Sequence, residues 1–305
     1  MNVIADAAFV IGLFVVGVVF AAMVDALAAK CFDKTPVPVL LSTLLSRLRE
    51  PDPGHRRVDK VLFYAAAPVA LTAVMIGMIA LTVDSRSATL PGPQLHVGVF
   101  FYLVVLDIMA VALFMAGWGS NQEQGVEGAF IAGAQLVSYV VPLGFSVTGA
   151  IMAAQSLSTA DIVNAQHGLL LGIWQPFGFV IYLLAAMGQT YRPPVNLPVA
   201  GGKSDVLIEY RGAEDALMRL ALYGIWFAAA AMGTVLFLGG WKGPLLPGVV
   251  WFFVKVGAVL ALMAYLERRL RPMGVHRMLR FAWLVLIPAS IINVIIVGLI
   301  LMVTK

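Results

Sequence analysis

The sequence has little charge for its length. Of its 305 residues only 12% are charged, whereas 61% are hydrophobic. A soluble domain carries about twice that share of charged residues, so the composition excludes a soluble globular protein and indicates a polytopic membrane protein. The first apolar run lacks a basic leader and a small-residue cleavage site, and we therefore expect it to be retained as a helix.

Cysteine is almost absent, since Cys31 is the only one. One cysteine cannot build a disulfide framework or ligate an iron–sulfur cluster. The sequence also has no P-loop, no glycine-rich dinucleotide motif and no Cys/His metal spacing. Its histidines (His55, His96, His167 and His276) fall in loops or at the ends of apolar runs, where solvated surface is the usual role. We therefore expect no metal and no cofactor bound by this chain, and no catalysis by it alone.

Long apolar runs are what the sequence has in abundance. A helix needs about 20 apolar residues to cross about 30 Å of hydrocarbon, and eight runs approach or exceed this length. They predict an all-α polytopic membrane protein with eight transmembrane helices in a single membrane domain over residues 1–305. The short alternating segments of a transmembrane barrel do not occur. The predicted spans are 3–27, 61–83, 95–118, 127–154, 168–188, 215–240, 247–266 and 280–303.

Lysine and arginine lie almost entirely on one side of these spans. Sixteen of the twenty fall in or beside the loops 28–60, 189–214 and 267–279, and three fall on the opposite side. Because basic loops stay on the cytoplasmic side, this asymmetry predicts a bacterial-type inner membrane protein with both termini on the outer side. The net charge of +4 reflects these loops and gives no sign of a nucleic-acid surface.

The first basic loop contains the segment PVPVLLSTLLSRLRE, residues 36–50. Its apolar residues recur every three or four positions and are followed by basic ones. This spacing predicts an amphipathic helix that lies in the membrane interface. A simple amphipathic linker is the alternative.

Ionisable residues in or beside the spans are candidates for a proton path, because a charge within a membrane is costly and usually functional. Asp107 lies in the middle of its span, and Lys255 on another span is its candidate counter-ion. A purely structural ion pair is the alternative for these two. Asp25 and Glu127 lie at span ends, where a role at the helix terminus is the alternative. Asp215, at the start of its span, completes the set of candidates.

Five segments, in order along the chain, have a distinctive composition. They are AGWGSNQEQGVEGAFIAGAQLVSY (116–139), WQPFGFVIYLLAAMGQTYRPPVNLP (174–198), IEYRG (208–212), TVLFLGGWKGP (234–244) and RLRPMGVHRMLRFAWLVLIPASIINV (269–294). Together they resemble the H subunit of respiratory complex I, NADH-quinone oxidoreductase. The second segment is similar to that family's fifth span and its AETNRAPFDLP loop. The others are similar to its GWASN, EYSG and FLGGW motifs and to its last arginine-rich span.

The resemblance implies a membrane-arm subunit that anchors the peripheral arm, lines the quinone chamber and links it to proton translocation. In that family the loop after the fifth span faces hydrophilic subunits that carry the last iron–sulfur cluster. The implied partners are those subunits, other membrane-arm subunits, quinone and the lipid bilayer. The residues implied at the quinone chamber or docking loop are Gln189, Arg192, Pro194, Asn196, Glu209, Tyr210 and Arg211.

The carboxylates that the family places inside the membrane are missing here. Gln189 replaces a glutamate and Asn196 an aspartate, while Val140 and Leu222 stand where the family has glutamates in its fourth and sixth spans. An aliphatic side chain cannot take up a proton. Either the other acids, such as Asp107, form the relay, or this member does not relay protons in the family's usual way.

Two other functions stay open at this point. One is the equivalent membrane subunit of a membrane-bound hydrogenase-type complex, which the GWGSN and FLGGW segments disfavour. The other is a stand-alone transporter. The absence of inverted repeats of the transporter kind counts against it.

Overall fold

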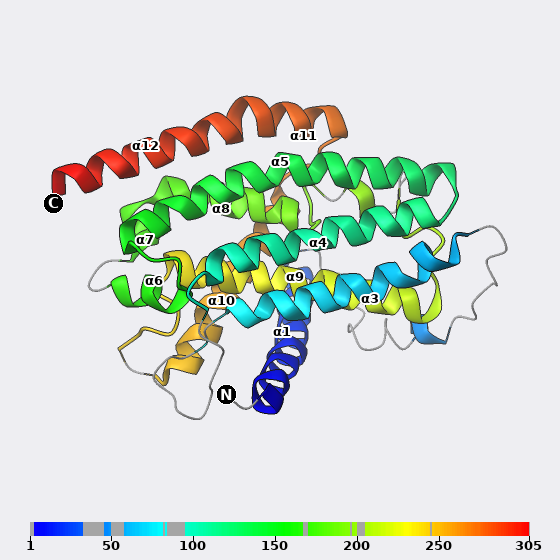
Figure 1. Cartoon of the computed structure of the whole chain (residues 1–305), viewed down its shortest axis with the longest axis horizontal. Helices are drawn as coiled ribbons and strands as arrows, with labels where there is room; N and C mark the ends of the chain where they lie inside the picture. The colour runs from blue at the N-terminus through cyan, green and yellow to red at the C-terminus, as the bar shows by residue number, and fades with distance from the viewer. Residues whose placement is uncertain are drawn as a thin grey trace.

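The computed structural model describes residues 3–32, 46–49, 58–81, 83, 95–166, 170–195, 197–199, 205–244 and 246–304. All regular secondary structure in these ranges is helical (Figure 1). The all-α prediction is therefore confirmed. The predicted interfacial helix at 36–50 lies outside the described residues except for its last few positions.

Seven helices among the described residues are long and apolar enough to cross a membrane, and each corresponds to a predicted span. The last of them is continuous through a π-helical segment, in which the helix widens by about one residue per turn. The seven are α1 (Val3–Phe32), α3 (Lys60–Gly77) with η1 (Met78–Ala80), α4 (Gly98–Gly119), α5 (Glu123–Ala154), α9 (Gly212–Phe237), α10 (Gly248–Arg269), and α11 (Val275–Phe281) with η3 (Ala282–Leu286) and α12 (Ile287–Thr304).

The predicted span 168–188 is not one continuous helix. It consists of α7 (Leu171–Trp174) and α8 (Pro176–Gln189), with a break at Gln175. Pro176 has no backbone N–H to donate and begins a new helix instead of continuing the old one. At 1.5 Å per residue α8 is about 21 Å long, which is less than the hydrocarbon thickness. A further short helix, α6 (Thr159–Ala165), precedes it and was not predicted.

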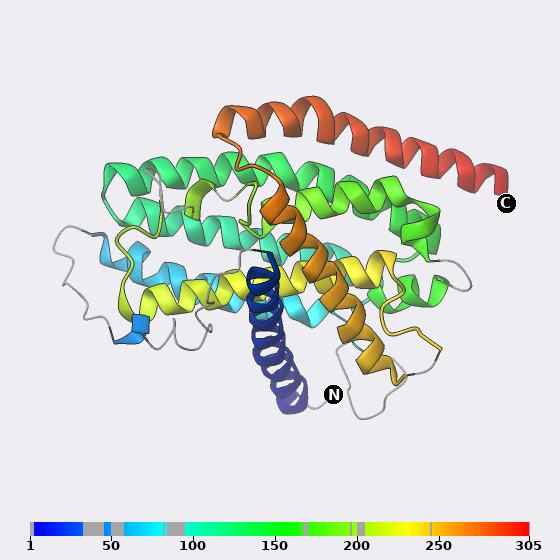
Figure 2. The ribbon, with the colours of Figure 1, turned by 180° about the vertical axis from the view of Figure 1, so that it is seen from behind.

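Five helices, α3, α4, α5, α8 and α9, run roughly along the long axis of the molecule (Figure 1). The α11–α12 helix covers one flank, while α1 and α10 cross the opposite flank at a steep angle (Figures 1 and 2). The most buried span is α9, in which Trp226, Phe227 and the alanines 228–231 are all inaccessible. Small residues let neighbouring helices approach α9 closely, so α9 is the central helix of the bundle.

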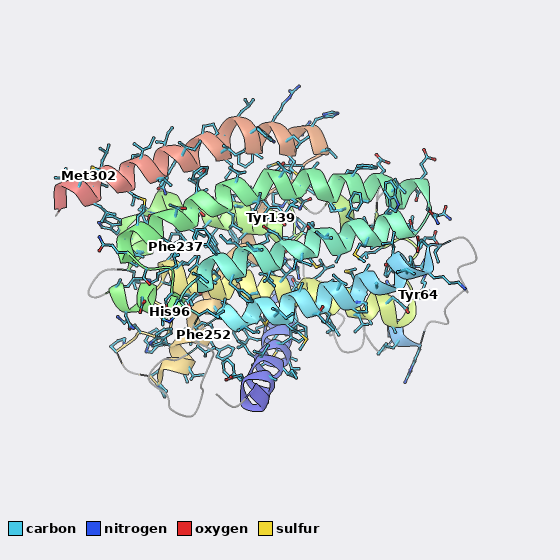
Figure 3. The ribbon with its side chains drawn as sticks, in the orientation of Figure 1. Tyr64, His96, Tyr139, Phe237, Phe252 and Met302 are labelled. Atoms are coloured by element: carbon cyan, nitrogen blue, oxygen red, sulfur yellow. The ribbon has the colours of Figure 1, made fainter. Side chains whose placement is uncertain are left out.

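Large apolar side chains lie exposed on the outer helices. Met302, near the end of α12 in Figure 3, is 80% exposed, and Val61 on α3 is 76% exposed. Apolar surface of this extent suits contact with lipid rather than water. The surface therefore agrees with a membrane-spanning bundle.

The GWGSN segment forms the tight connection between α4 and α5. A Cβ atom on Gly117 would overlap the carbonyl oxygen of Gly125, and one on Gly119 would lie 2.7 Å from the backbone nitrogen of Phe63. The motif is therefore explained by close backbone packing. This connection, the segments 189–195 and 205–212, and the arginine-rich segment 268–280 belong to the half of the bundle that we call the basic end.

Candidate functional site

Arg192, in the loop after α8, is the centre of a group of charged and aromatic side chains. Its Nη1 atom lies 3.3 Å from Asp25 Oδ2 on α1 and 3.3 Å from Glu267 Oε2 on α10. Its guanidinium carbon lies 4.1 Å from the ring centroid of Trp226 and 5.0 Å from that of Tyr223, both on α9. We call the six residues Asp25, Arg192, Tyr223, Trp226, Glu267 and Arg268 the Arg192 cluster.

The Arg192 cluster is electrically balanced and largely shielded from solvent. Arg268 Nη2 lies 3.3 Å from Asp25 Oδ1, and the hydroxyl of Tyr223 donates to Asp25 Oδ2 at 3.0 Å. Two carboxylates thus face two guanidinium groups. Burial alone would lower the pKa of Arg192, but Glu267 and Asp25 outweigh it and raise this pKa above the usual value. Arg192 therefore stays charged, and its removal would leave Glu267 without the cation that it faces.

The loop that carries Arg192 is held rigidly against α5. The Nε2 atom of the buried Gln135 donates to the carbonyl oxygens of Gly188 at 2.7 Å and Val195 at 2.6 Å. Tyr191 has a φ of +53°, a left-handed conformation that costs on the order of 1 kcal/mol outside glycine. Its ring is buried, so tertiary packing maintains this conformation. The position of Arg192 is therefore fixed by the fold.

Replacing Gln135 with leucine should loosen this loop. The carbonyls of the buried Gly188 and the half-buried Val195 would lose their donor, and we expect the variant to be less stable by about 2 kcal/mol. The readouts are thermal unfolding in detergent and the rate of proteolysis between residues 189 and 205. The matched control is Gln124→Leu, at an exposed position on the same helix. Equal behaviour of the two variants would contradict this role of Gln135.

A second group of polar side chains lies deeper, where α4, α5 and α8 meet. The carboxylate of Asp107, in the middle of α4, lies close to the side chains of Gln189 and Tyr139. Tyr139 in turn lies beside Tyr191. Figure 3 shows Tyr139 between α5 and α4, in the middle of the bundle. We call Tyr102, Asp107, Tyr139, Tyr182, Gln189 and Tyr191 the Asp107 cluster.

Several polar atoms of the Asp107 cluster are buried without a hydrogen-bond partner among the described residues. They include Asp107 Oδ1, both amide atoms of Gln189 and the hydroxyls of Tyr139 and Tyr191. In contrast, the hydroxyl of Tyr182 donates to the carbonyl of Ala229 at 2.7 Å. Burial raises the pKa of Tyr191, which therefore remains protonated. Adjacent carboxyl and hydroxyl groups of this kind can pass a proton along when they form hydrogen bonds, and the amide of Gln189 can orient them.

The predicted pairing of Asp107 with Lys255 is wrong. Lys255 Nζ donates to the carbonyls of Leu238 at 2.6 Å, Gly240 at 3.1 Å and Lys242 at 2.6 Å. These carbonyls lie at and just beyond the C-terminal end of α9, where backbone acceptors lack helical donors and attract a cation. Lys255 therefore satisfies the FLGGW turn, and its charge has a structural explanation.

The other proton-path candidates lie apart from the Asp107 cluster. Asp25 belongs to the Arg192 cluster. Asp215 is 1% exposed and forms two ion pairs, one with Arg219 at 2.8 Å and one with Arg47 at 3.6 Å. Glu127 lies on the exposed face of α5. Of the five proton-path candidates, Asp107 is therefore the one that lies within a buried group of polar side chains in the bundle interior.

The remaining residues of the predicted docking loop take different positions. The hydroxyl of Tyr210 donates to the carbonyl of Phe63 at 2.6 Å, which fixes the 205–212 turn against α3. Arg211 is exposed and its Nη1 donates to the carbonyl of Tyr210, while Glu209 is half-buried beside them. Pro194 is buried in the loop, and Asn196 lies outside the described residues.

Sequence reasoning missed most partners of these side chains. Arg268 was counted only as a cation of a basic loop, and Glu267 was not singled out. Tyr223 and Trp226 were only apolar positions of a span. The available signal was the pair of aromatic residues about three turns into the span that follows the loop, together with the ERR run that ends α10. Which of these residues meets Arg192 depends on helix packing, which the sequence does not state.

The fold and the two clusters define an all-helical polytopic membrane protein with a rigid, charge-balanced loop at one end. The sequence model of the NADH dehydrogenase family matches residues 48–298. The H subunit of NADH-quinone oxidoreductase numbered 2 in Rhodopseudomonas palustris is 32% identical over 259 residues, which cover 84% of this chain and 79% of that protein. The H subunit numbered 1 in Geobacter metallireducens is 33% identical over 270 residues, which cover 86% of this chain and 82% of that protein. The chain belongs to the NADH dehydrogenase family, as the ordered segments predicted.

Proposed function

We propose that this chain is the H-type membrane-arm subunit of a complex I-type NADH–quinone or ferredoxin–quinone oxidoreductase. In this role it anchors the peripheral arm and lines the quinone chamber, and it is part of the enzyme without being catalytic alone. The observation that carries the proposal is the Arg192 cluster. It joins α1, α9, α10 and the loop after α8 at the basic end, in the segment that resembles the family's chamber loop.

The Arg192 cluster has the chemistry that a quinone headgroup requires. The half-buried Tyr223 offers an aromatic face. Arg192 and Arg268 each carry five N–H donors, more than their carboxylate partners engage, and can donate to a carbonyl oxygen. Electrons would come from an iron–sulfur cluster of a partner protein. The residues of this chain would bind and orient the quinone, and the Asp107 cluster would connect the chamber to the membrane interior for protons.

The membrane is the inner bacterial membrane in this proposal, with both termini on the outer side. The basic asymmetry of the loops supports this orientation. Cys31 supplies a native test, because it is a free, exposed thiol at the end of α1. A membrane-impermeant maleimide should label Cys31 in inside-out vesicles and leave it unlabelled in intact spheroplasts.

The control for this labelling is Leu246→Cys in a Cys31→Ser background, because Leu246 is exposed in the connection between α9 and α10. It should show the reverse pattern. Labelling after detergent denaturation corrects for shielding of either thiol by partner proteins. Labelling of Cys31 from outside the spheroplast would contradict the proposed orientation.

Purification of the tagged chain in mild detergent tests its place in a complex. We expect it to copurify with hydrophilic subunits that contain iron and to reduce a short-chain quinone with NADH or reduced ferredoxin as donor. A hydrogenase-type complex would instead evolve hydrogen from the same preparation without a quinone. A chain that purified alone or only with copies of itself would contradict the proposal and favour a transporter.

A further inference from the structure

A cavity of about 290 Å³ lies between α5, α8 and the segment 270–286, on the flank covered by α11–α12. Its walls are almost wholly apolar and include Leu184, Met273, Met278, Phe281 and Leu286. Gln135 also borders it, but its Nε2 atom is engaged by the carbonyls of Gly188 and Val195. Ser138 and Tyr139 border it too, but polar atoms contribute almost nothing to the surface of its walls. A cavity with such walls suits a hydrocarbon chain rather than a polar ligand.

The outer wall of this cavity is adaptable. Ala282 and Leu286, which line it, begin and end the π-helical segment η3, a type of irregularity that occurs often at functional sites. Two of the lining residues, Met273 and Met278, are methionines, whose flexible thioethers adjust to the shape of an apolar ligand. The wall can therefore adjust to a chain of variable length and saturation.

The same wall carries unpaired positive charge. Arg271, Arg277 and Arg280 are exposed, and no described acidic side chain forms an ion pair with any of them. Arg277 and Arg280 lie three residues apart on one face of α11 and are the direct neighbours of the lining residues Met278 and Phe281. Basic residues beside an intramembrane cavity are typical of sites for anionic lipid headgroups.

We propose that this cavity and the three arginines bind one anionic phospholipid. An acyl chain occupies the cavity, and the phosphate lies on Arg277 and Arg280. A quinone tail would leave the arginines without an anion, and a zwitterionic lipid would neutralise them less well. The backbone N–H of Met273 donates to the carbonyl of Pro194 at 2.9 Å, and Pro194 and Val195 border the cavity. The lipid therefore supports the loop that carries Arg192, on the side of the loop that faces the cavity.

Lipid retention in the purified complex tests this site. The complex is delipidated, exchanged into detergent with phosphatidylglycerol or phosphatidylcholine, and the bound lipid is counted by native mass spectrometry. We expect the native complex to retain one phosphatidylglycerol that phosphatidylcholine does not displace. Affinity should fall about fivefold for each arginine removed in the Arg277→Gln/Arg280→Gln variant. Ala282→Leu, which fills the cavity, should also lose the lipid.

Matched controls separate the site from general effects of charge and volume. Lys60→Gln removes an exposed cation at the basic end on α3, and Ala261→Leu adds volume on an exposed face of α10. Both should keep the lipid. Equal retention in the double arginine variant and in Lys60→Gln would overturn the proposal. A quinone bound in the cavity would also overturn it. In that case Ala282→Leu would lose the bound quinone and the double arginine variant would keep it. The arginine variant changes only exposed side chains, so it decides the question even if Ala282→Leu fails to fold.

Discussion

Replacing Arg192 with alanine should either lower the rate of quinone reduction at least tenfold or release the peripheral arm. A tenfold loss of rate corresponds to about 1.4 kcal/mol of transition-state stabilisation. Asp25 and Glu267 each lie 3.3 Å from its guanidinium group. Without it, Glu267 loses this partner and two partly buried carboxylates face each other. Breaking a buried ion pair from one side costs about 3–5 kcal/mol, so the C-terminal parts of α1 and α10 should separate from the middle of α9. The measurements are donor–quinone activity and the subunit composition of the purified complex.

Graded variants show whether geometry or charge alone matters at this position. Arg192→Lys keeps the charge but not the planar group that bridges two carboxylates and stacks on Trp226, so it should recover only part of the activity. Glu267→Gln in the Arg192→Ala background removes the carboxylate that has lost its cation, since Asp25 still faces Arg268, and it should restore part of the stability. Lys60→Ala, at an exposed cation of the same end, should behave like the native chain. Native activity and composition in Arg192→Ala would refute the role assigned to the cluster.

Replacing Asp107 with asparagine should lower the number of protons taken up per electron while leaving the complex assembled. No described cation pairs with Asp107, so the neutral variant leaves no unpaired partner charge behind. This differs from Arg192, and we expect little change in stability. Asparagine retains the hydrogen-bonding positions next to Gln189 and Tyr139 but cannot bind and release a proton at neutral pH.

The experiment compares proton uptake in reconstituted vesicles with assembly on a native gel. Glu127→Gln is the matched control, because it neutralises an exposed acid on α5 that lies apart from the Asp107 cluster. It should pump like the native complex. Unchanged pumping in an intact Asp107→Asn complex would remove Asp107 from the proton path. Absence of pumping in the native complex would mean that the loss of the family's carboxylates had already uncoupled this member.

The spans and the family could be predicted from sequence, because long apolar runs and ordered motifs are local signals. The break in the helix within 168–188 was not predicted, because hydropathy is continuous there although Pro176 starts a new helix. The prediction was wrong at Lys255, because a mid-span lysine suggested an acidic partner. The carbonyls of Leu238, Gly240 and Lys242, brought there by the turn after α9, bind it instead.

The importance of Arg192 was visible from its stiff loop, but its surroundings were not. Asp25, Tyr223 and Glu267 come from three helices widely separated in the sequence. Their meeting depends on the steep crossing of α1 and α10 over α9 (Figure 2). The Asp107 cluster was hidden for a similar reason, since its tyrosines look like ordinary apolar positions until helix packing brings their hydroxyl groups together.

Photolabelling with a short-chain azidoquinone tests the central claim, that the Arg192 cluster forms part of a quinone chamber. The complex is irradiated with the probe during turnover, and labelled peptides of this chain are identified by mass spectrometry. We expect labelling of the peptides around Tyr191–Arg192 and Tyr223–Trp226, prevented by excess unlabelled quinone and strongly reduced in Arg192→Ala. Labelling that avoids these peptides, or that excess quinone does not prevent, would contradict the claim.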